Sequence, residues 1–399
     1  MSKKNRHKEK LANRKTAHKL RILWCSNAVW SKSGYGNQSR DLLFRFLKDG
    51  WAVAQSAFYG LEGGVIDYQG LRMYPKMASA WGEDGAVMHG QDWNADITIC
   101  FQDSWVMDVN ALSQMRRYTP YLPVDHDPVP PGVLERVAKA YRIITYSKFG
   151  QKALLDRGFN STCIPHGVDT AVFAPLQRVP VREKYGIPSD LFIFGMVSDN
   201  KDNPPRKQFQ RIMDGFKLFT ENHPKSGMYF HAILNQQGGF PIHEYAKQIG
   251  ISEKIFFSPP YQLALRTDNQ QVAEIQNMFD CLVCASAGEG FGMPITEAQS
   301  CGVPVIVTDH TAMPELIIEG ETGFAVNPGY KRFSPLLSYV AEPDPRDIHE
   351  AMEKIFKMDQ VKTSKSCRDH ILAEYDIVKI VANMWSPLFE EIETEIYGG

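Results

Sequence analysis

The sequence lacks long hydrophobic runs and has no large excess of charge of one sign. No apolar run reaches about 18 residues, the length at which a membrane-spanning helix is expected, so we expect no such helix. The first 21 residues are polar and basic and do not contain the apolar core of a secretory signal peptide. The formal net charge of −2 at pH 7 excludes a polyanion-binding function that rests on overall charge.

Cysteine is also sparse. Seven cysteines are scattered over 399 residues, and this odd, unpatterned set predicts reduced thiols in a cytoplasmic protein rather than a disulfide framework. Cys281 and Cys284 form the one close pair. They fall in an expected strand at 280–286, where their spacing sends the side chains to opposite faces. We therefore expect them to pack in the core and not to bind a metal ion.

The rest of the chain alternates between strand and helix patterns. A strand is expected at 21–27, followed by a turn with Gly34 and Gly36, an amphipathic helix and a strand at 51–58. This order is that of a βαβ unit in a parallel sheet. A stretch with several prolines at about 173–190 interrupts the pattern and is interpreted as an interdomain linker.

The pattern restarts with a strand at 191–198 and continues to a helical tail. Two successive Rossmann-like halves account for the length, so the predicted fold class is α/β with two doubly wound domains. The predicted parts are a basic flexible arm at 1–20, a first domain at 21–180, a second domain at 188–370, and C-terminal helices at 371–399 that pack back on the first domain.

The N-terminal arm is the one strongly charged segment. Residues 1–21 carry nine Lys and Arg against one Glu. Such a run is typical of a solvated tail that only aids solubility. The alternative is an arm that orders on an anionic partner, either DNA or an anionic membrane surface.

The segment SAGEGFGMPITEAQSCGVPVIVTD, residues 286–309, places a glycine turn between an apolar strand and a helix. Pro294 suits the first position of that helix, and Glu297 is expected in its first turn. Ligands of doubly wound sheets bind beyond the carboxyl ends of the strands, where such turns lie. Glu297 can accept hydrogen bonds from ribose hydroxyls and Glu289 from a second sugar. The alternative is that Glu297 is only a helix residue favoured by the helix dipole and that Glu289 is a solvated carboxylate in a loop.

These residues also carry a family resemblance. EGFGMPITEAQSCGVPVIVTD, followed by MPELIIEGETGFAV, closely resembles the E-x7-E segment of retaining GT-B glycosyltransferases of the family-4 type. IPHGVDTAVFAP (164–175) resembles that family's interdomain motif, and GYGNQSRDLLFRFLKDGWAV resembles its first glycine loop and helix. The resemblance spans about residues 21 to 356. It implies a GT-B fold, with an acceptor-side domain and a nucleotide-sugar-binding domain facing across a cleft.

The resemblance implies roles for the residues of the second domain. Glu297 would bind the nucleotide ribose, and Glu289 would hold the donor sugar together with the backbone of Gly290, Phe291 and Gly292. Tyr261, in the turn at 258–262, would line the nucleobase pocket, although an aromatic residue in such a turn is as often a packing residue.

Cations are needed to neutralise the leaving diphosphate, because members of the family are typically metal-independent. The family usually has an arginine soon after the first strand of the second domain, where this sequence has Met196. Lys207 matches the lysine that usually follows, and Arg206 beside it is the candidate for the displaced arginine. The alternative is a solvated helix start, a place where the helix dipole disfavours cations.

On the acceptor side, the DHD sequence at 125–127 occupies the place of the family's histidine. His126 would orient a donor hydroxyl rather than act as a base; its alternative is a satisfied structural histidine. Gly34 and Gly36 would allow the backbone to approach the substrate closely; the alternative is that they only form a tight turn. The acceptor-side candidates are Gly34, Tyr35, Gly36, Asp125 and Asp127.

The resemblance implies that the protein transfers a hexose to an acceptor hydroxyl with retention of configuration and has no resident cofactor. The donor is expected to be a UDP-sugar, because such donors are frequent in the family. The leaving phosphate would accept the acceptor's proton, so no general base is expected. The acceptor stays open among a glycan, a lipid-linked sugar, a small molecule and modified DNA. The alternatives are a DNA glycosyltransferase acting on hydroxymethylated bases and a GT-B nucleotide-sugar epimerase; a non-catalytic binding module is disfavoured by Glu289, Glu297 and Lys207.

Overall fold

The computed structural model of the protein describes residues 18–201, 205–233, 238–260, 263 and 268–398. Most of the predicted basic arm therefore lies outside the described residues. The chain separates into two compact units. The first comprises the described parts of Met1–Phe101, Val106–Thr119 and Val381–Gly399, and the second comprises those of Gln102–Trp105 and Pro120–Ile380.

In the first unit, the parallel strands β2, β1 and β5 lie side by side, and the β3–β4 hairpin extends the sheet beyond β2, in the order β3-β4-β2-β1-β5. The interior of β1 is buried along its length, as expected for a central parallel strand. The elements are β1 Arg21–Asn27, α2 Gly34–Lys48, β2 Ala52–Tyr59, β3 Ile66–Tyr68, β4 Leu71–Tyr74, α3 Glu83–Asp92, β5 Ile97–Phe101 and α4 Val109–Leu112.

The C-terminal helix α16 (Ser386–Tyr397) and the π-turn before it, Val381–Trp385, belong to this first unit. The buried ring of Trp385 packs edge-on against Trp24, with ring centroids 5.7 Å apart. The last residues of the predicted arm reach the same helix, because the Leu20 N–H donates to Glu393 Oε1 at 2.9 Å. Leu20 is thus a core residue of this unit.

The second unit contains most of β6, together with β7 and β8, and these strands follow one another in that order as parallel strands. The strand predicted at 117–127 is shorter than expected. It ends at Leu122, just before Pro123, and residues 125–127 lie in a loop. The elements here are β6 Tyr118–Leu122, α5 Pro131–Val137, β7 Ile144–Thr145, α6 Lys148–Leu155 and β8 Thr162–Cys163.

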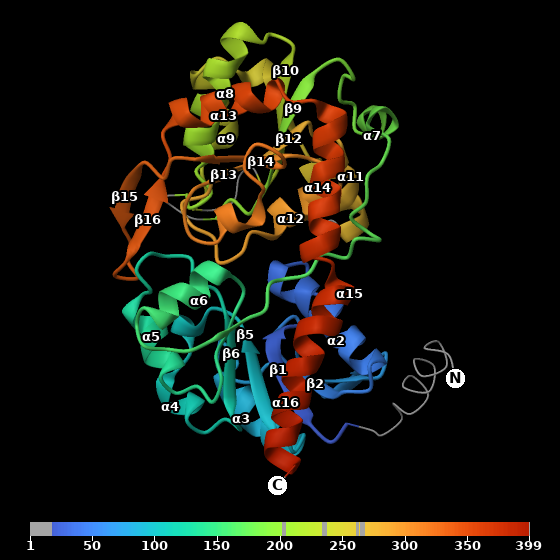
Figure 1. Ribbon diagram of the computed structural model, residues 1–399, viewed down its shortest axis with the longest axis vertical. Coiled ribbons are helices and arrows are strands. Elements are labelled where there is room, and N and C mark those ends of the chain that lie inside the picture. The colour runs from blue at the N-terminus through green and yellow to red at the C-terminus, as the bar shows by residue number, and fades with distance from the viewer. Residues whose placement is uncertain (1–17, 202–204, 234–237, 261–262, 264–267, 399) are drawn as a thin grey trace, which may run out of the picture. The chain divides into compact units, whose positions relative to one another are not determined.

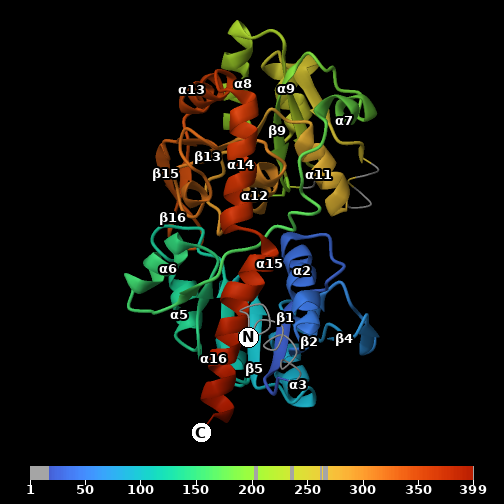
Figure 2. The ribbon, with the colours of Figure 1, turned by 45° about the vertical axis from the view of Figure 1, so that its right-hand side comes forward.

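A second parallel sheet follows in this unit, with the strand order β11-β10-β9-β12-β13-β14. Helices α8, α9 and α13 share one apolar core on one face, and α11, α12 and α14 cover the other (Figures 1 and 2). The elements are β9 Phe192–Val197, α8 Phe209–Asn222, β10 Ser226–His231, α9 Ile242–Gln248, β11 Ile255–Phe257, α11 Asn269–Asn277, β12 Cys281–Cys284, α12 Met293–Ser300, β13 Val305–Thr308, β14 Gly323–Val326, α13 Pro345–Phe356, α14 Gln360–Glu374 and α15 Ile377–Ile380.

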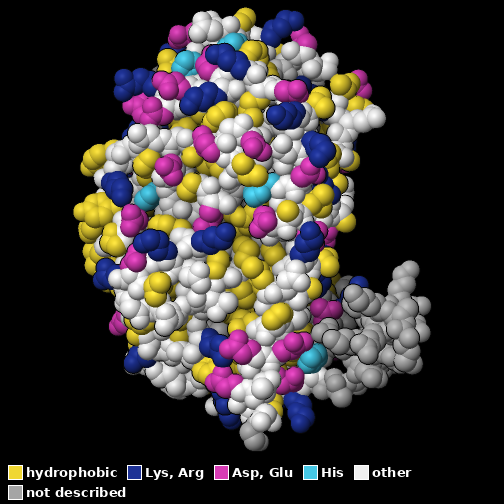
Figure 3. All heavy atoms as spheres, in the orientation of Figure 1, with side chains coloured by type: hydrophobic (Ala, Val, Ile, Leu, Met, Phe, Trp, Pro, Cys, Tyr) yellow, Lys and Arg dark blue, Asp and Glu magenta, His cyan; other side chains and the backbone are white. Residues whose placement is uncertain are grey.

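Between β14 and α13 the chain forms an antiparallel hairpin that the sequence patterns did not predict. Its strands are β15 (Tyr330–Phe333) and β16 (Tyr339–Glu342). The two strands are only four residues long, too short to show a clear alternation of polar and apolar residues. Hydrophobic side chains gather on the surface over this hairpin, at the left edge of Figure 3.

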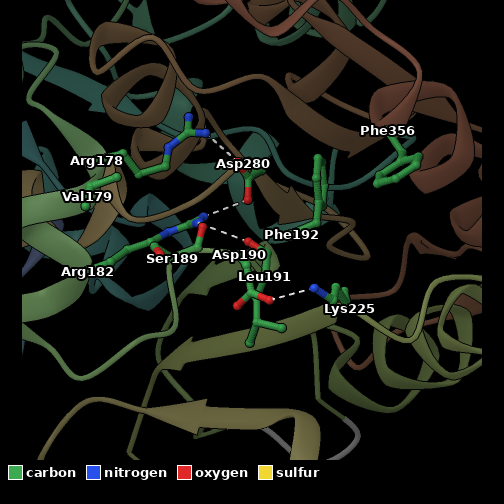
Figure 4. A pocket seen from close by; sticks show the side chains of 10 residues that line it. All are labelled: Arg178, Val179, Arg182, Ser189, Asp190, Leu191, Phe192, Lys225, Asp280 and Phe356. Carbon is green, nitrogen blue, oxygen red and sulfur yellow. Dashed lines mark hydrogen bonds and ion pairs between the residues drawn. The ribbon is translucent and has the colours of Figure 1, made fainter.

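The predicted linker also contains structure, because helix α7 (Arg178–Lys184) forms within it. Arg182, with 3% of its surface exposed, donates from Nη2 to Asp280 Oδ2 at 2.6 Å, and Arg178 pairs with the other oxygen of the same carboxylate (Figure 4). Asp280 directly precedes β12, so the pocket in Figure 4 lies at the amino end of that strand. Ligands of such sheets bind at the opposite, carboxyl ends, so we interpret this cluster as structural.

The Asp280 cluster makes a prediction about stability. Replacing Asp280 with Asn should lower the free energy of unfolding by about 3–5 kcal/mol, because it leaves the buried Arg182 without its charged partner. Asp190→Asn on the wall of the same pocket is the matched control, since its pair with Lys225 is largely exposed and should be worth less than about 1 kcal/mol. Thermal unfolding of both variants checks this; equal melting temperatures would contradict it.

Candidate functional site

The glycine turn at 287–292 follows the carboxyl end of β12 and leads into α12. The helix begins at Met293, one residue earlier than predicted, because Gly292 takes a left-handed conformation with φ of 108° and serves as the N-cap. Pro294 is therefore the second helical residue. Glu297 is the fifth. The prediction placed it in the first turn of the helix, whereas it lies in the second turn, and its side chain is buried.

Two glycines of this turn pack tightly against the loop that follows β6. A Cβ atom at Gly288 would come under 3.0 Å from the carbonyl oxygen of Asp125, and one at Gly290 would come equally close to Pro123. The glycines thus bring the backbone of the turn against the loop that carries His126. Close backbone packing explains these glycines without any ligand.

Glu289 is the electrostatic centre of the turn. Its side chain is buried, with 7% of the residue exposed, and its Oε2 lies 2.9 Å from Nη1 of Arg206, while Oε1 pairs with Nζ of Lys207. Burial by itself would raise the pKa of the Glu289 carboxyl, but the charges of Arg206 and Lys207 outweigh it and lower the pKa to about 2. Glu289 is therefore a carboxylate at neutral pH.

Arg206 and Lys207 were predicted at the start of helix α8, but they lie in the turn that precedes it. The helix begins at Phe209, because Gln208 adopts a left-handed conformation with φ of 55°. Arg206 is also tied to the glycine turn by its backbone and side chain, since Nη1 donates to the Gly288 carbonyl at 2.6 Å. Both cations are thus fixed next to Glu289 rather than solvated at a helix end.

His126 is held by its neighbour. Its Nδ1 lies 2.7 Å from Oδ1 of Asp125, and the histidine is buried. Burial would raise the pKa of Asp125, but the hydrogen bond and charge of His126 outweigh it, so the pKa of Asp125 is lowered. Because an ionised carboxylate only accepts hydrogen bonds, Nδ1 of His126 carries a proton and donates a hydrogen bond to Asp125 Oδ1. Asp125 thereby sets the orientation of His126.

Two further residues at this edge were missed by the sequence patterns. His310 and Thr311 follow the carboxyl end of β13, the neighbour of β12. Thr311, with a positive φ of 54°, accepts a hydrogen bond from the Glu289 N–H on its Oγ1 at 3.0 Å. The rule that parallel strands present their carboxyl ends at one edge, applied to β13 as well as β12, would have drawn attention to both.

The remaining candidates lie in different surroundings. Phe291 is buried, with its ring centroid 5.0 Å from that of His166, so its side chain is a packing residue. Asp127 is half exposed and pairs with Lys331 at 3.3 Å. Tyr261 lies outside the described residues.

Gly34, Tyr35 and Gly36 belong to the first unit. They were predicted to precede the helix, but they form the first turn of α2. Ser33 is the N-cap, and its side chain accepts a hydrogen bond from the Gly36 N–H at 3.1 Å. A Cβ at Gly36 would clash with the Ser31 carbonyl, so packing within the unit accounts for this glycine.

Three general features of the described residues bear on the type of site. No group of three or more His, Cys, Asp or Glu side chains among them is placed to hold a metal ion. None of the helices they form is both long and apolar enough to cross a membrane. Cys281 and Cys284 are buried in β12, as predicted.

Comparisons with known proteins give matches to the sequence and to the fold of this chain. Residues 181–355 match the family model of glycosyl transferases group 1. The chain is 24% identical over 169 residues to the D-inositol 3-phosphate glycosyltransferase of Stackebrandtia nassauensis, an alignment that covers 41% of this chain and 37% of that protein. The chain thus matches less than half the length of this curated relative.

Solved structures match over most of the chain. Sucrose-phosphate synthase from Thermosynechococcus elongatus has a TM-score of 0.73 at 15% identity, covering 94% of this chain and 99% of the other. Alr3699/HepE of Anabaena in complex with UDP-glucose has a TM-score of 0.69 at 15% identity, covering 92% of this chain and 99% of the other. At these identities the likeness shows the fold, and the predicted α/β GT-B fold with two parallel Rossmann-like sheets is confirmed.

The close packing of the turn predicts the effect of adding one methyl group. Gly290→Ala should lower the free energy of unfolding by about 1–3 kcal/mol, because the new Cβ would overlap Pro123. Gly64→Ala is the control, since a Cβ there meets no atom within 4 Å. If thermal unfolding showed the two variants to be equally stable, the close packing described here would be incorrect.

The Glu289 ion pairs predict a pH-dependent effect on stability. The pKa of Glu289 is lowered from its ordinary 4.5 to about 2, so its charge stabilises the folded state above pH 4.5, and this contribution is lost as the pH falls towards 2. Glu289→Gln should therefore cost on the order of 3 kcal/mol at pH 7 and progressively less below pH 4.5. Melting temperatures across this range check it; a difference that does not change with pH would contradict it.

Proposed function

We propose that the protein is a retaining enzyme that transfers a hexose from a nucleoside diphosphate sugar to an acceptor hydroxyl, because residues 181–355 match the family model of glycosyl transferases group 1. The observation that carries this proposal is the buried Glu289 carboxylate held between Arg206 and Lys207, at the carboxyl ends of a parallel sheet. UDP-glucose is the first donor to test, since a protein of similar fold is described in complex with it.

The charges of the cluster suit a diphosphate. Arg206 and Lys207 together exceed the charge of Glu289 by one unit, so the cluster presents net positive charge to an incoming anion. Glu289 holds both cations in place before the donor arrives, and preorganised charges stabilise developing negative charge without a cost of reorganisation. In this proposal Arg206 and Lys207 bind the diphosphate and stabilise it as it leaves.

The hexose and the ribose of the donor are bound by groups that neighbour the diphosphate site. Glu289 and the N–H groups of the glycine turn hold the hexose hydroxyls, and Glu297 on α12 accepts hydrogen bonds from the ribose. His126, with its ring orientation fixed by Asp125, hydrogen-bonds a donor hydroxyl through Nε2. Asp125 acts through His126 and is a positioning residue.

The chemical step then needs no additional base. The bond between the anomeric carbon and the β-phosphate oxygen breaks, and a bond forms between that carbon and the acceptor oxygen on the same face. The acceptor's proton passes to the departing phosphate oxygen. Transfer on one face retains the anomeric configuration.

The proposal is tested by nucleoside diphosphate release from UDP-, GDP- and ADP-sugars. Each donor is supplied alone, with a glycan panel, with a lipid extract and with hydroxymethylated duplex DNA. Release that rises with one acceptor class supports transfer, and stimulation by DNA would instead favour the DNA glycosyltransferase. An isomerised nucleotide sugar without any acceptor would favour the epimerase. No release and no donor binding would overturn the proposal.

The same assay checks the individual roles. Lys207→Ala should lower kcat by about 100–1000-fold, because it removes a fixed charge from the leaving group. Glu297→Ala should raise the KM for the donor at least about tenfold through the lost ribose hydrogen bonds. Lys225→Ala removes an exposed cation of the same unit and should leave both constants unchanged. A Lys207→Ala enzyme as active as the Lys225→Ala control would exclude the proposed role.

A further inference from the structure

Thr311, in the loop after β13, adopts a backbone conformation that threonine rarely takes. Its φ of 54° lies in the left-handed region, where the Cβ atom of an L-residue crowds the carbonyl oxygen that follows. Glycine populates this region freely, whereas a β-branched residue there is a genuine outlier. Among the non-glycine residues that the structure describes with a positive φ, Thr311 is the only β-branched one. Such strain persists only where surrounding contacts compensate for it.

The compensating contacts join this loop to Glu289. The buried hydroxyl group of Thr311 accepts a hydrogen bond from the Glu289 N–H at 3.0 Å and donates one to the His310 carbonyl at 2.8 Å. The next residue holds the other side of Glu289, because the Ala312 N–H donates to the Glu289 carbonyl at 3.4 Å. Both backbone polar groups of Glu289 are thus bonded by two successive residues of the loop.

The methyl group of Thr311 lies close to the residue before Glu289. A Cβ atom built at Gly288 would be 3.9 Å from Thr311 Cγ2, and the Gly288 carbonyl accepts a hydrogen bond from Arg206 Nη1 at 2.6 Å. Thr311 therefore contacts the turn at the two residues that also bind Arg206. A glycine at position 311 would take the same φ without strain, but it would offer neither the hydroxyl nor the methyl group.

A second threonine on the same edge provides a comparison. Thr308, the last residue of β13, is fully buried and donates from Oγ1 to the Ser286 carbonyl at 2.8 Å. Ser286 belongs to the segment between β12 and α12, like Glu289, but precedes it by three residues. Each threonine thus gives one buried hydroxyl to this segment, and Thr311 is the one whose hydroxyl bonds Glu289.

We propose that Thr311 is a positioning residue, whose hydroxyl holds the backbone of Glu289 so that its carboxylate lies between Arg206 and Lys207 and faces the hexose of the donor. Groups that bind a reacting molecule have to be held within about 0.5 Å of their productive geometry by supporting hydrogen bonds of this kind. This inference rests on the proposed function, because Glu289 is assigned there to the hexose. It adds the residue that keeps Glu289 in place.

The test separates the hydroxyl group from the strain. Thr311→Val keeps the branched shape and removes the hydroxyl, Thr311→Gly removes both the hydroxyl and the strain, and Thr311→Ser keeps the hydroxyl. Thr308→Val is the matched control, because it removes a buried hydroxyl that bonds the same segment at Ser286. The release of nucleoside diphosphate from UDP-, GDP- and ADP-sugars gives kcat for each variant, and thermal unfolding gives its stability.

We expect kcat to fall about tenfold or more in Thr311→Val and Thr311→Gly, because small displacements of a binding group are costly to the rate. Thr311→Ser and Thr308→Val should stay within about threefold of the native kcat. Thr311→Gly should unfold at a higher temperature than Thr311→Val, because it relieves the strain. A low kcat in the more stable of the two variants would therefore not be an effect of unfolding.

A double-mutant cycle gives a second readout that requires no turnover. Glu289→Gln is introduced into the native protein, into Thr311→Gly and into Thr308→Val, and the melting temperatures are compared at pH 7. In the Thr311→Gly background the effect of Glu289→Gln should shrink to about half or less, because the carboxylate is no longer held between its two cations. In the Thr308→Val background the two effects should add.

With an active native protein, the inference is overturned if Thr311→Val and Thr311→Gly are as fast as Thr308→Val, or if Thr311→Ser is as slow as they are. It is also overturned if Glu289→Gln has the same effect on the melting temperature in all three backgrounds. A native protein that neither binds a donor nor releases nucleoside diphosphate counts against the proposed function, and the double-mutant cycle then decides the inference.

Discussion

The site depends on one buried carboxylate that two cations keep ionised. Burying Glu289 without Arg206 and Lys207 would favour its neutral form, and burying the two cations without Glu289 would leave unpaired positive charge in a poorly solvated place. Each member of the cluster is therefore a condition for the others. Because the cations come from the β9–α8 connection and the carboxylate from the β12–α12 connection, this constraint also fixes two loops against each other.

The packing around the cluster follows from that constraint. Gly288 and Gly290 allow the turn to lie against the loop after β6, and Thr311 Oγ1 accepts a hydrogen bond from the Glu289 N–H. The β15–β16 hairpin closes the arrangement, because it bonds to the turn on one side and to the His126 loop on the other. Loops at the carboxyl ends of parallel strands thus converge on one cluster of charged and hydroxyl-bearing side chains.

Much of the fold and part of the site could be predicted from the sequence. The strand at 21–27 is apolar throughout and bounded by turn residues, and the glycine turn with its two glutamates has a distinctive local pattern. The adjacency of Arg206 and Lys207 to Glu289 is a tertiary contact between residues about eighty positions apart, so the resemblance suggested a shared site but no local pattern could show the ion pairs.

The errors of prediction also have physical reasons. Helix α7 forms in the expected linker because Asp280, distant in sequence, satisfies its two arginines, and that partner is invisible to a local pattern. The β15–β16 hairpin is too short for a periodic signal, and it is stabilised by bonds to remote loops. His310 was missed because a single histidine after a strand gains meaning only from its neighbours in space.

The central claim is that Arg206 and Lys207 bind a diphosphate. Calorimetric titration with UDP and with uridine tests it directly, because the two ligands differ only in the phosphates. The account predicts that UDP binds much more tightly than uridine to the native protein, and that this preference largely disappears in the Arg206→Ala/Lys207→Ala double variant. A preference for UDP that is the same in both proteins would contradict the account.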